Sequence, residues 1–428
     1  MAANPNTIPL RTTWTKEYQL VYDKMPVYPA VTSHRLAPNL EKGDIVKRTY
    51  PRQFIAKTTG GDGAFTRQVI VDTEETLTIN QEKDAGFYIK SLDEIQSHLP
   101  TRTRYAQENV KALHRDIDAN VLAEYSNMTN ALDAASFSGT ATYGITVTPT
   151  NVAKLFSSVG VLLNMANVYI NIPMKFTGNK LNDAGQNMPV AVISPQVYAQ
   201  IVERKESKDT IEGDNVGKNG YCGKYFGYNL FVSNALTWTG TLKLATNPTN
   251  TDTITIMGVT FTFVSSIGST AGNVLIGAAA TDTRDNIVTL ITTPGTTTAT
   301  GVALSSTPDS NGFSDQDRFT NVTTVNSGTT VTWVAKGKGF CAVSSNLTAA
   351  ADGWDTNLQI QHCLIGVEGA IDLVMAKEPS LDERKRDGYL GYDVVAWMAY
   401  GIKTFNDGKG KLVDVKVLTS AYTGDDSN

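Results

Sequence analysis

Histidine and cysteine, the side chains that most often bind metals or act as nucleophiles, are sparse in this sequence of 428 residues. They are His34, His98, His114, His362, Cys222, Cys341 and Cys363. Their spacings match no zinc or dithiol motif. His362 and Cys363 are adjacent, but consecutive side chains of a strand point to opposite faces and make a poor shared site. We therefore expect no metal site, and three reduced thiols rather than a disulfide scaffold.

The glycine-rich segment from Gly213 to Gly227 comes nearest to a phosphate-binding motif. A P-loop needs GxxxxGK followed by Ser or Thr, placed between a strand and a helix. Here the spacing from Gly213 to Gly217-Lys218 is one residue short, and Asn219 replaces the hydroxyl residue. We therefore expect a flexible surface loop.

Carboxylates and hydroxyls offer no better candidate. Glu74 and Glu75 are adjacent on an expected strand, without the apolar pocket that would perturb the pKa of a general acid or base. The hydroxyl-rich part of the chain contains no GxSxG nucleophile elbow. The charge run from Asp382 to Asp387 is interpreted as a solvated loop, with a charged inter-subunit contact as the alternative. The sequence thus predicts no catalytic residue, no cofactor and no enzyme.

Composition indicates an ordinary globular chain, with 41% hydrophobic and 18% charged residues. The net charge of −5 argues against a dedicated nucleic-acid binder, although loose contact with DNA through a local basic segment stays open. The first eleven residues lack the apolar core of a secretory signal, and no apolar run approaches the roughly 18–20 residues of a membrane helix. We expect a soluble protein made in a cytoplasm.

Two N-terminal parts must lie on another surface to be stable. Residues 1–43 are polar and rich in proline, yet hold apolar side chains, so we favour an extended arm over a disordered tail. Residues 44–99 predict a β-hairpin with strands over 45–58 and 65–80 around the turn Gly60-Gly61-Asp62-Gly63. An isolated hairpin is marginal in water, so we predict that it docks on a neighbouring subunit; packing on its own subunit is the alternative.

The remaining chain predicts a long helix and an α/β domain with an insertion. Apolar residues spaced three or four apart indicate one helix over 102–136. Residues 145–238 alternate between helices and strands, with helix starts at Thr148-Pro149 and Ser194-Pro195. In residues 239–356 about a quarter are threonine and tyrosine is absent, which indicates an inserted, mainly β domain with its own core. Strand patterns return over 357–424, where Val413, Val415 and Val417 alternate with polar residues.

This order of parts resembles the Hong Kong 97 fold of the major capsid proteins of tailed bacteriophages. Thr76–Ile89 (TLTINQEKDAGFYI) is similar to the segment between E-loop and spine helix in coat proteins of the P-twenty-two type. Gly223–Asn234 (GKYFGYNLFVSN) is similar to a strand of their A-domain, and Tyr400-Gly401 with the valine-alternating end also fits. The insertion is similar in kind to their I-domain, while its own sequence looks more like small β modules of phage tail and surface proteins.

The resemblance implies an α+β fold and a division of the chain. Its parts would be an N-terminal arm (1–43), an E-loop hairpin with the start of the P-domain (44–99), the spine helix of the P-domain (100–147), an A-domain (148–238), an inserted β domain (239–356) and a return to the A- and P-domains (357–428). Inter-subunit contacts are expected at Lys57, Gly60, Gly61, Asp62 and Gly63. Some members cross-link an E-loop lysine to a neighbour's asparagine; Lys57 would be that lysine, but no catalytic glutamate can be matched.

The resemblance also implies partners and a location. The chain would form hexamers and pentamers of itself in an icosahedral shell around double-stranded DNA, in loose contact with that DNA. Scaffolding, portal and decoration or tail-connector proteins would be further partners. Assembly would take place in the cytoplasm of a bacterial host and the product would be the virion, with the insertion on its outer face. The alternative is another virion protein, such as a tail tube or decoration protein, which would explain the insertion but not the long helix.

Overall fold

The computed structural model describes residues 24–33, 45–51, 54–58, 67–91, 101–139, 143–168, 189–207, 222–309 and 313–419. The predicted hairpin turn Gly60-Gly61-Asp62-Gly63, the loop around Gly217-Lys218 and most of the predicted arm lie outside the described residues. The chain divides into two units. One draws its described residues from Glu82–Leu113 and Lys377–Met398, and the other from Lys24–Gln81, His114–Ala376 and Ala399 onward.

The larger unit is built on a mixed sheet whose described strands run in the order β13-β14-β9-β17-β6-β8-β7. Three further strands join this sheet: β16 pairs with β9, β20 pairs with β17, and β5 pairs with β20. The strands are β5 (Asn130–Leu132), β6 (Pro189–Ile193), β7 (Lys224–Tyr225), β8 (Tyr228–Val232), β9 (Trp238–Lys243), β13 (Val322–Ser327), β14 (Thr330–Ala335), β16 (Gly353–Trp354), β17 (Ile360–Val367) and β20 (Leu412–Leu418). All residues of β17 are buried, because it has neighbours on both edges and packed layers around it.

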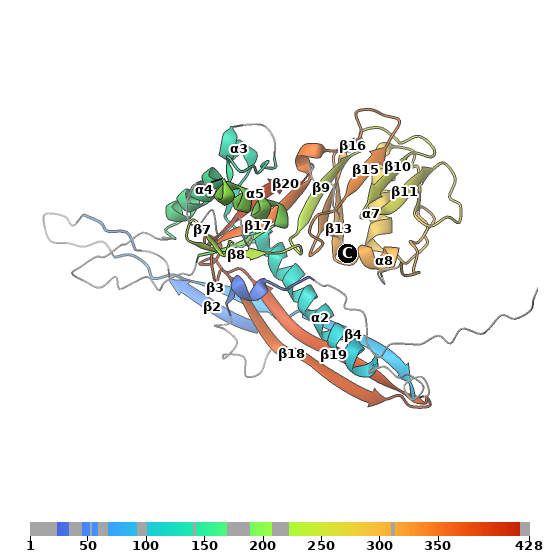
Figure 1. Ribbon diagram of the computed structural model, residues 1–428, viewed down its shortest axis with the longest axis horizontal. Coiled ribbons are helices and arrows are strands. Elements are labelled where there is room, and N and C mark those ends of the chain that lie inside the picture. The colour runs from blue at the N-terminus through green and yellow to red at the C-terminus, as the bar shows by residue number, and fades with distance from the viewer. Residues whose placement is uncertain are drawn as a thin grey trace, which may run out of the picture. The chain divides into compact units, whose positions relative to one another are not determined.

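Helices α4 (Val152–Met165) and α5 (Pro195–Glu206) contact each other, and α4 packs on β17 and β20 (Figure 1). The predicted start of α5 is confirmed, since Ser194 Oγ accepts a hydrogen bond from the N–H of Val197. The predicted start of α4 is wrong. Its N-cap is Asn151, whose side-chain oxygen accepts from the N–H of Thr148, so Thr148 and the proline after it form the turn before the helix.

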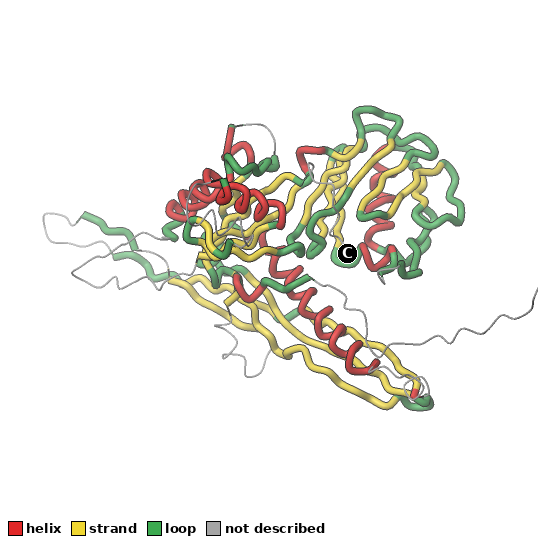
Figure 2. The backbone as a smooth tube through the Cα atoms, viewed as in Figure 1, coloured by secondary structure: helices red, strands yellow, loops and turns green. Residues whose placement is uncertain are grey.

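The inserted region adds a second sheet of order β12-β11-β10-β15. These strands are β10 (Thr253–Ile256), β11 (Val259–Val264), β12 (Asn273–Leu275) and β15 (Val343–Asn346). Met257 and Gly258 have φ of 51° and 76°, which makes the tight hairpin turn between β10 and β11. Helix α7 (Ala280–Thr292) packs against β12, β13 and β14, so it touches both sheets, as the red helix among yellow strands in Figure 2 shows.

A cluster of buried apolar side chains fills this region, including Trp238, Phe261, Phe263 and Trp333. The predicted boundary at residue 239 falls inside β9, which pairs with β14 on one edge and with β17 on the other. The inserted strands therefore continue the main sheet, and no linker separates them from it at this point.

A further sheet has the order β1-β18-β19-β4. Its strands are β1 (Thr32–Ser33), β4 (Gln81–Lys90), β18 (Ile371–Lys385) and β19 (Gly391–Lys403). Short helices elsewhere in the described chain are η1 (Tyr28–Ala30), η4 (Thr356–Leu358), α3 (Ala134–Ser138) and α8 (Asp315–Arg318). Residues 383–387 of the charge run are exposed and Asp382 is half-buried, and the first four residues of the run belong to β18 rather than to the predicted loop.

The predicted long helix is shorter than expected. Helix α2 (Thr101–Leu122) is followed by η3 (Ala123–Asn127) and then by strand β5. The prediction is wrong at the C-terminal end of the helix. Leu132 is buried there as a residue of β5, where it pairs with Val415 of β20. Pairing with the sheet outweighs the helical period there.

Candidate inter-subunit hairpin and its anchor

The predicted hairpin is present, but its paired part is short. Strands β2 (Ile45–Pro51) and β3 (Asp72–Thr78) pair in antiparallel register from Ile45 and Thr78 to Pro51 and Asp72. Proline has no N–H to donate, which explains why the ladder ends at Pro51. Farther out, the side chain of Gln68 accepts from the N–H of Ile55 and donates to its carbonyl, so one side chain joins the two segments where no strand pairing is present.

The segments beyond the paired part expose a row of large apolar side chains. They are Phe54, Ile55, Val69, Ile70 and Val71, with exposed fractions of 61%, 68%, 73%, 76% and 47%. Lys57 on the same segment is also exposed. Isolated exposed apolar residues are normal, but five large ones within two short segments favour an interaction surface.

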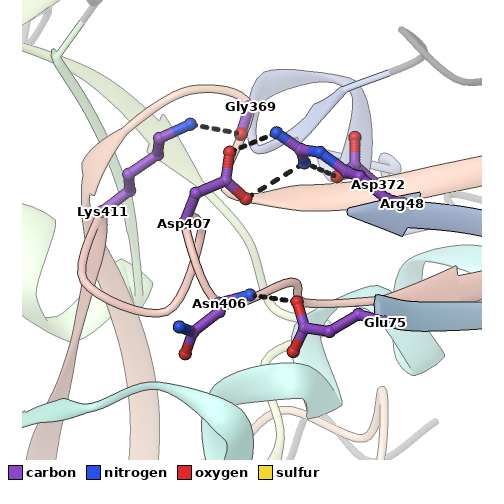
Figure 3. A network of polar contacts seen from close by, with 7 residues as sticks. All are labelled: Arg48, Glu75, Gly369, Asp372, Asn406, Asp407 and Lys411. Atoms are coloured by element: carbon purple, nitrogen blue, oxygen red, sulfur yellow. Dashed lines mark hydrogen bonds and ion pairs between the residues drawn. The ribbon is translucent and has the colours of Figure 1, made fainter. Parts of the chain in front are cut away.

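The base of the hairpin is held by a polar network, shown in Figure 3. The guanidinium of Arg48 makes two ion contacts with the carboxylate of Asp407, with Nη1 to Oδ1 at 3.0 Å, and a third with the buried Asp372 at 3.4 Å. On the other strand, Glu75 accepts from the backbone N–H of Asn406 at 2.9 Å. Both strands of the hairpin are thus tied to the turn that follows β19.

An apolar cluster supports the same base. Val46 and Leu77 of the hairpin pack with Val374 of β18 and with Phe405, and all four are buried. The Arg48 guanidinium lies 5.4 Å from the centre of the Phe405 ring. The base is therefore fixed on its own chain by both polar and apolar contacts, whereas the outer segments are exposed.

One arrangement resembles a catalytic triad and could not be found from sequence spacing. His362 Nδ1 lies 2.9 Å from Asp414 Oδ1, and His362 Nε2 lies 3.0 Å from Thr239 Oγ1. The imidazole and the carboxylate are each 5% exposed, and the Tyr125 ring stacks on the imidazole with 3.7 Å between centres. Burial and the nearby Asp414 raise the pKa of Tyr125 to about 12. Because the stacked ring covers the imidazole, we interpret this group as a structural connection between β9, β17 and β20.

The expected strand with Val413, Val415 and Val417 is confirmed as β20, and within it Asp414 is buried because His362 provides its partner inside the sheet. The three cysteines are buried and form no disulfide among the described residues, and burial raises the pKa of the Cys363 thiol to about 12. Across the described residues, no group of three or more His, Cys, Asp or Glu side chains could hold a metal ion. The helices in the described part of the chain include none that is long and apolar enough to cross a membrane.

No family model and no curated protein matches the chain. Solved phage structures match it in fold. A structure of Mycobacterium phage Che8 gives a TM-score of 0.53 at 13% identity, with 96% of this chain and 98% of that chain covered. The capsid of Cyanophage P-SCSP1u gives 0.50 at 12% identity over 96% and 93%. The mature capsid of bacteriophage PhiM1 gives 0.50 at 9% identity over 97% and 94%. The chain therefore has the α+β fold of these phage capsid structures, which confirms the expected fold class.

Proposed function

We propose that this chain is a major capsid protein, a structural subunit that assembles into the icosahedral head of a tailed phage around double-stranded DNA. The fold is the observation that carries the proposal. The similarity to two capsid structures covers 96% and 97% of this chain and 93% and 94% of theirs, so it is not limited to one part of the fold.

The hairpin formed by β2 and β3 is a second feature that supports a role in assembly. Its base is anchored on its own chain, while its outer apolar row is exposed. Complete burial of one fully exposed side chain of this kind contributes about 1.5–3 kcal/mol. These five are 47–76% exposed, so burying them contributes roughly 5–10 kcal/mol per subunit before the cost of association. A neighbouring copy of the chain is the partner that a closed shell offers to every such hairpin.

Further partners and the location follow from this role. Lys57 and the turn Gly60-Gly61-Asp62-Gly63 would contact the neighbouring subunit in hexamers and pentamers. Scaffolding, portal and decoration or tail-connector proteins would meet the shell, and packaged DNA would touch it loosely. The chain would be located in the virion after assembly in the bacterial cytoplasm, and it would catalyse no reaction.

Electron microscopy of the purified full-length protein, alone and with its scaffolding protein, tests the proposal. Closed shells, or ring-shaped capsomers that sediment far above the monomer, are the expected result. Open tubes would instead identify a tail tube protein. A monomer that stays inert at high concentration and toward shells of the same phage would contradict the proposal, and a monomer that binds only to preformed shells would identify a decoration protein.

A further inference from the structure

Residues 24–33 form a strap that lies against helix α2 within the larger unit. Half of its side chains are buried, namely Val27, Tyr28, Val31, Thr32 and Ser33. Its C-terminal end pairs as β1 with the first residues of β18, and the Lys24 amine at its other end donates to the carbonyls of Gly337 and Lys338. The strap is thus fixed at both ends, and the contact in its middle is made with α2.

That middle contact includes one buried carboxylate. Asp118 of α2 is 1% exposed, and its Oδ1 accepts from the backbone N–H groups of Val27 at 2.8 Å and Tyr28 at 2.7 Å. Its Oδ2 is buried and has no hydrogen-bond partner among the described residues. A buried carboxylate is stable in its ionised form only when it is well paired, and within the part of the chain that the structure describes one of its two oxygens is not.

The charged and titratable groups on the surrounding elements are few. Helix α2 carries His114 and Arg115, the strap carries Lys24, and the loop that Lys24 reaches carries Lys338. Within the described part of the chain, none of these cations forms an ion pair with Asp118. His114 belongs to the strap contact in another way, since its Nδ1 lies 3.2 Å from the hydroxyl of Tyr28.

We propose that Asp118 is a proton-operated latch, which holds the strap more tightly when its carboxyl group is neutral than when it is ionised. Opening the strap lets water reach the carboxylate, so ionisation favours the open state. The pKa of Asp118 agrees with this geometry. Burial raises it from 3.8 to about 6, against the opposing effect of the two backbone N–H groups.

The direction of the pH effect follows from proton linkage. With a pKa near 6 in the closed state and 3.8 in the open state, the closed state binds more protons between these two values. The strap is therefore tightest below the lower value, weakens as the pH rises through the window, and changes little above it. Between pH 5 and pH 7 the opening equilibrium should increase roughly tenfold.

Hydrogen exchange of the full-length subunit tests the latch. The measured quantity is the protection of peptides that contain Val27 and Tyr28, corrected for the intrinsic pH dependence of exchange. In the wild type this protection should fall roughly tenfold from pH 5 to pH 7. In Asp118→Asn, which keeps an oxygen acceptor without charge, protection should be independent of pH and higher than wild type at pH 7.

Two control variants distinguish titration of Asp118 from titration of its neighbours. Asp116→Asn changes a carboxylate on the same helix that hydrogen-bonds Tyr400 rather than the strap, and it should keep the wild-type pH dependence. His114→Gln should also keep it. The proposal is overturned if wild-type protection does not change between pH 5 and pH 7, if the change disappears in His114→Gln but persists in Asp118→Asn, or if Asp118→Asn is less protected than wild type at pH 7 while its circular dichroism is unchanged.

Discussion

Arg48 and Asp407 are separated by 359 positions in the sequence, yet their side chains form an ion pair with two contacts at the base of the hairpin. Arg48 belongs to β2 and Asp407 to the turn after β19. This pair joins two segments that are far apart in the sequence, and it holds the base of the hairpin on its own chain. Assembly through the hairpin depends on this division between an anchored base and an exposed outer part.

Arg48→Met should lower the free energy of unfolding by about 1 kcal/mol. The substitution removes a partly exposed ion pair with Asp407 and the contact of the guanidinium with the Phe405 ring. Denaturant unfolding of the subunit measures the change. Lys47→Met is the matched control, because Lys47 and its partner Glu74 are 63% and 58% exposed, and it should change stability very little. Equal effects of the two substitutions would contradict the anchoring role of Arg48.

Asp414→Ala should lower the free energy of unfolding by about 3 kcal/mol, because it leaves His362 without its partner inside the sheet. The melting temperature of the purified subunit should fall by several degrees. Asp387→Ala removes an exposed carboxylate from the turn between β18 and β19 and should leave the melting temperature unchanged. If instead Asp414→Ala abolished a hydrolytic activity while stability was retained, the structural interpretation of the Thr239, His362 and Asp414 group would be wrong.

Arg284→Met should destabilise the inserted region by about 2–3 kcal/mol. The guanidinium is buried and donates to the carbonyls of Leu244 and Gly328 and to the side chain of Asn326, so the variant leaves three acceptors without this donor. Tryptophan fluorescence reports on this region through the buried Trp238 and Trp333. Arg384→Met, at a side chain that is 79% exposed, should melt like wild type.

Much of the fold could be predicted from local patterns. Alternation around Met257-Gly258 gives the hairpin of the insertion, and Ser194 gives the cap of α5. The hairpin of residues 45–78 and the strands near the C-terminus follow from their β-branched and aromatic content. These features depend on residues close together in the sequence, which is why the sequence alone determines them.

The anchor and the strap could not be predicted in the same way. The partners of Arg48, Asp118 and His362 are between 52 and 359 positions away, so no spacing in the sequence connects them. Leu132 departs from its helical pattern because the main sheet supplies a strand partner for it, and the buried partner of Asp414 likewise comes from another strand of that sheet. The inter-subunit role of Lys57 and of the turn from Gly60 to Gly63 stays a prediction.

Shell formation by a hairpin variant tests the central claim most directly. The triple variant Ile55→Ser, Val69→Ser, Ile70→Ser removes three exposed apolar side chains from the outer hairpin and leaves Arg48 and the base unchanged. Val325→Ser, at a side chain of similar exposure on β13, is the control. Sedimentation and electron microscopy should find shells for the wild type and for the control. The triple variant should be soluble, with the circular dichroism of the wild type, and should form no stable shells. Shells of normal yield and heat resistance from the triple variant would contradict the claim that the hairpin joins neighbouring subunits.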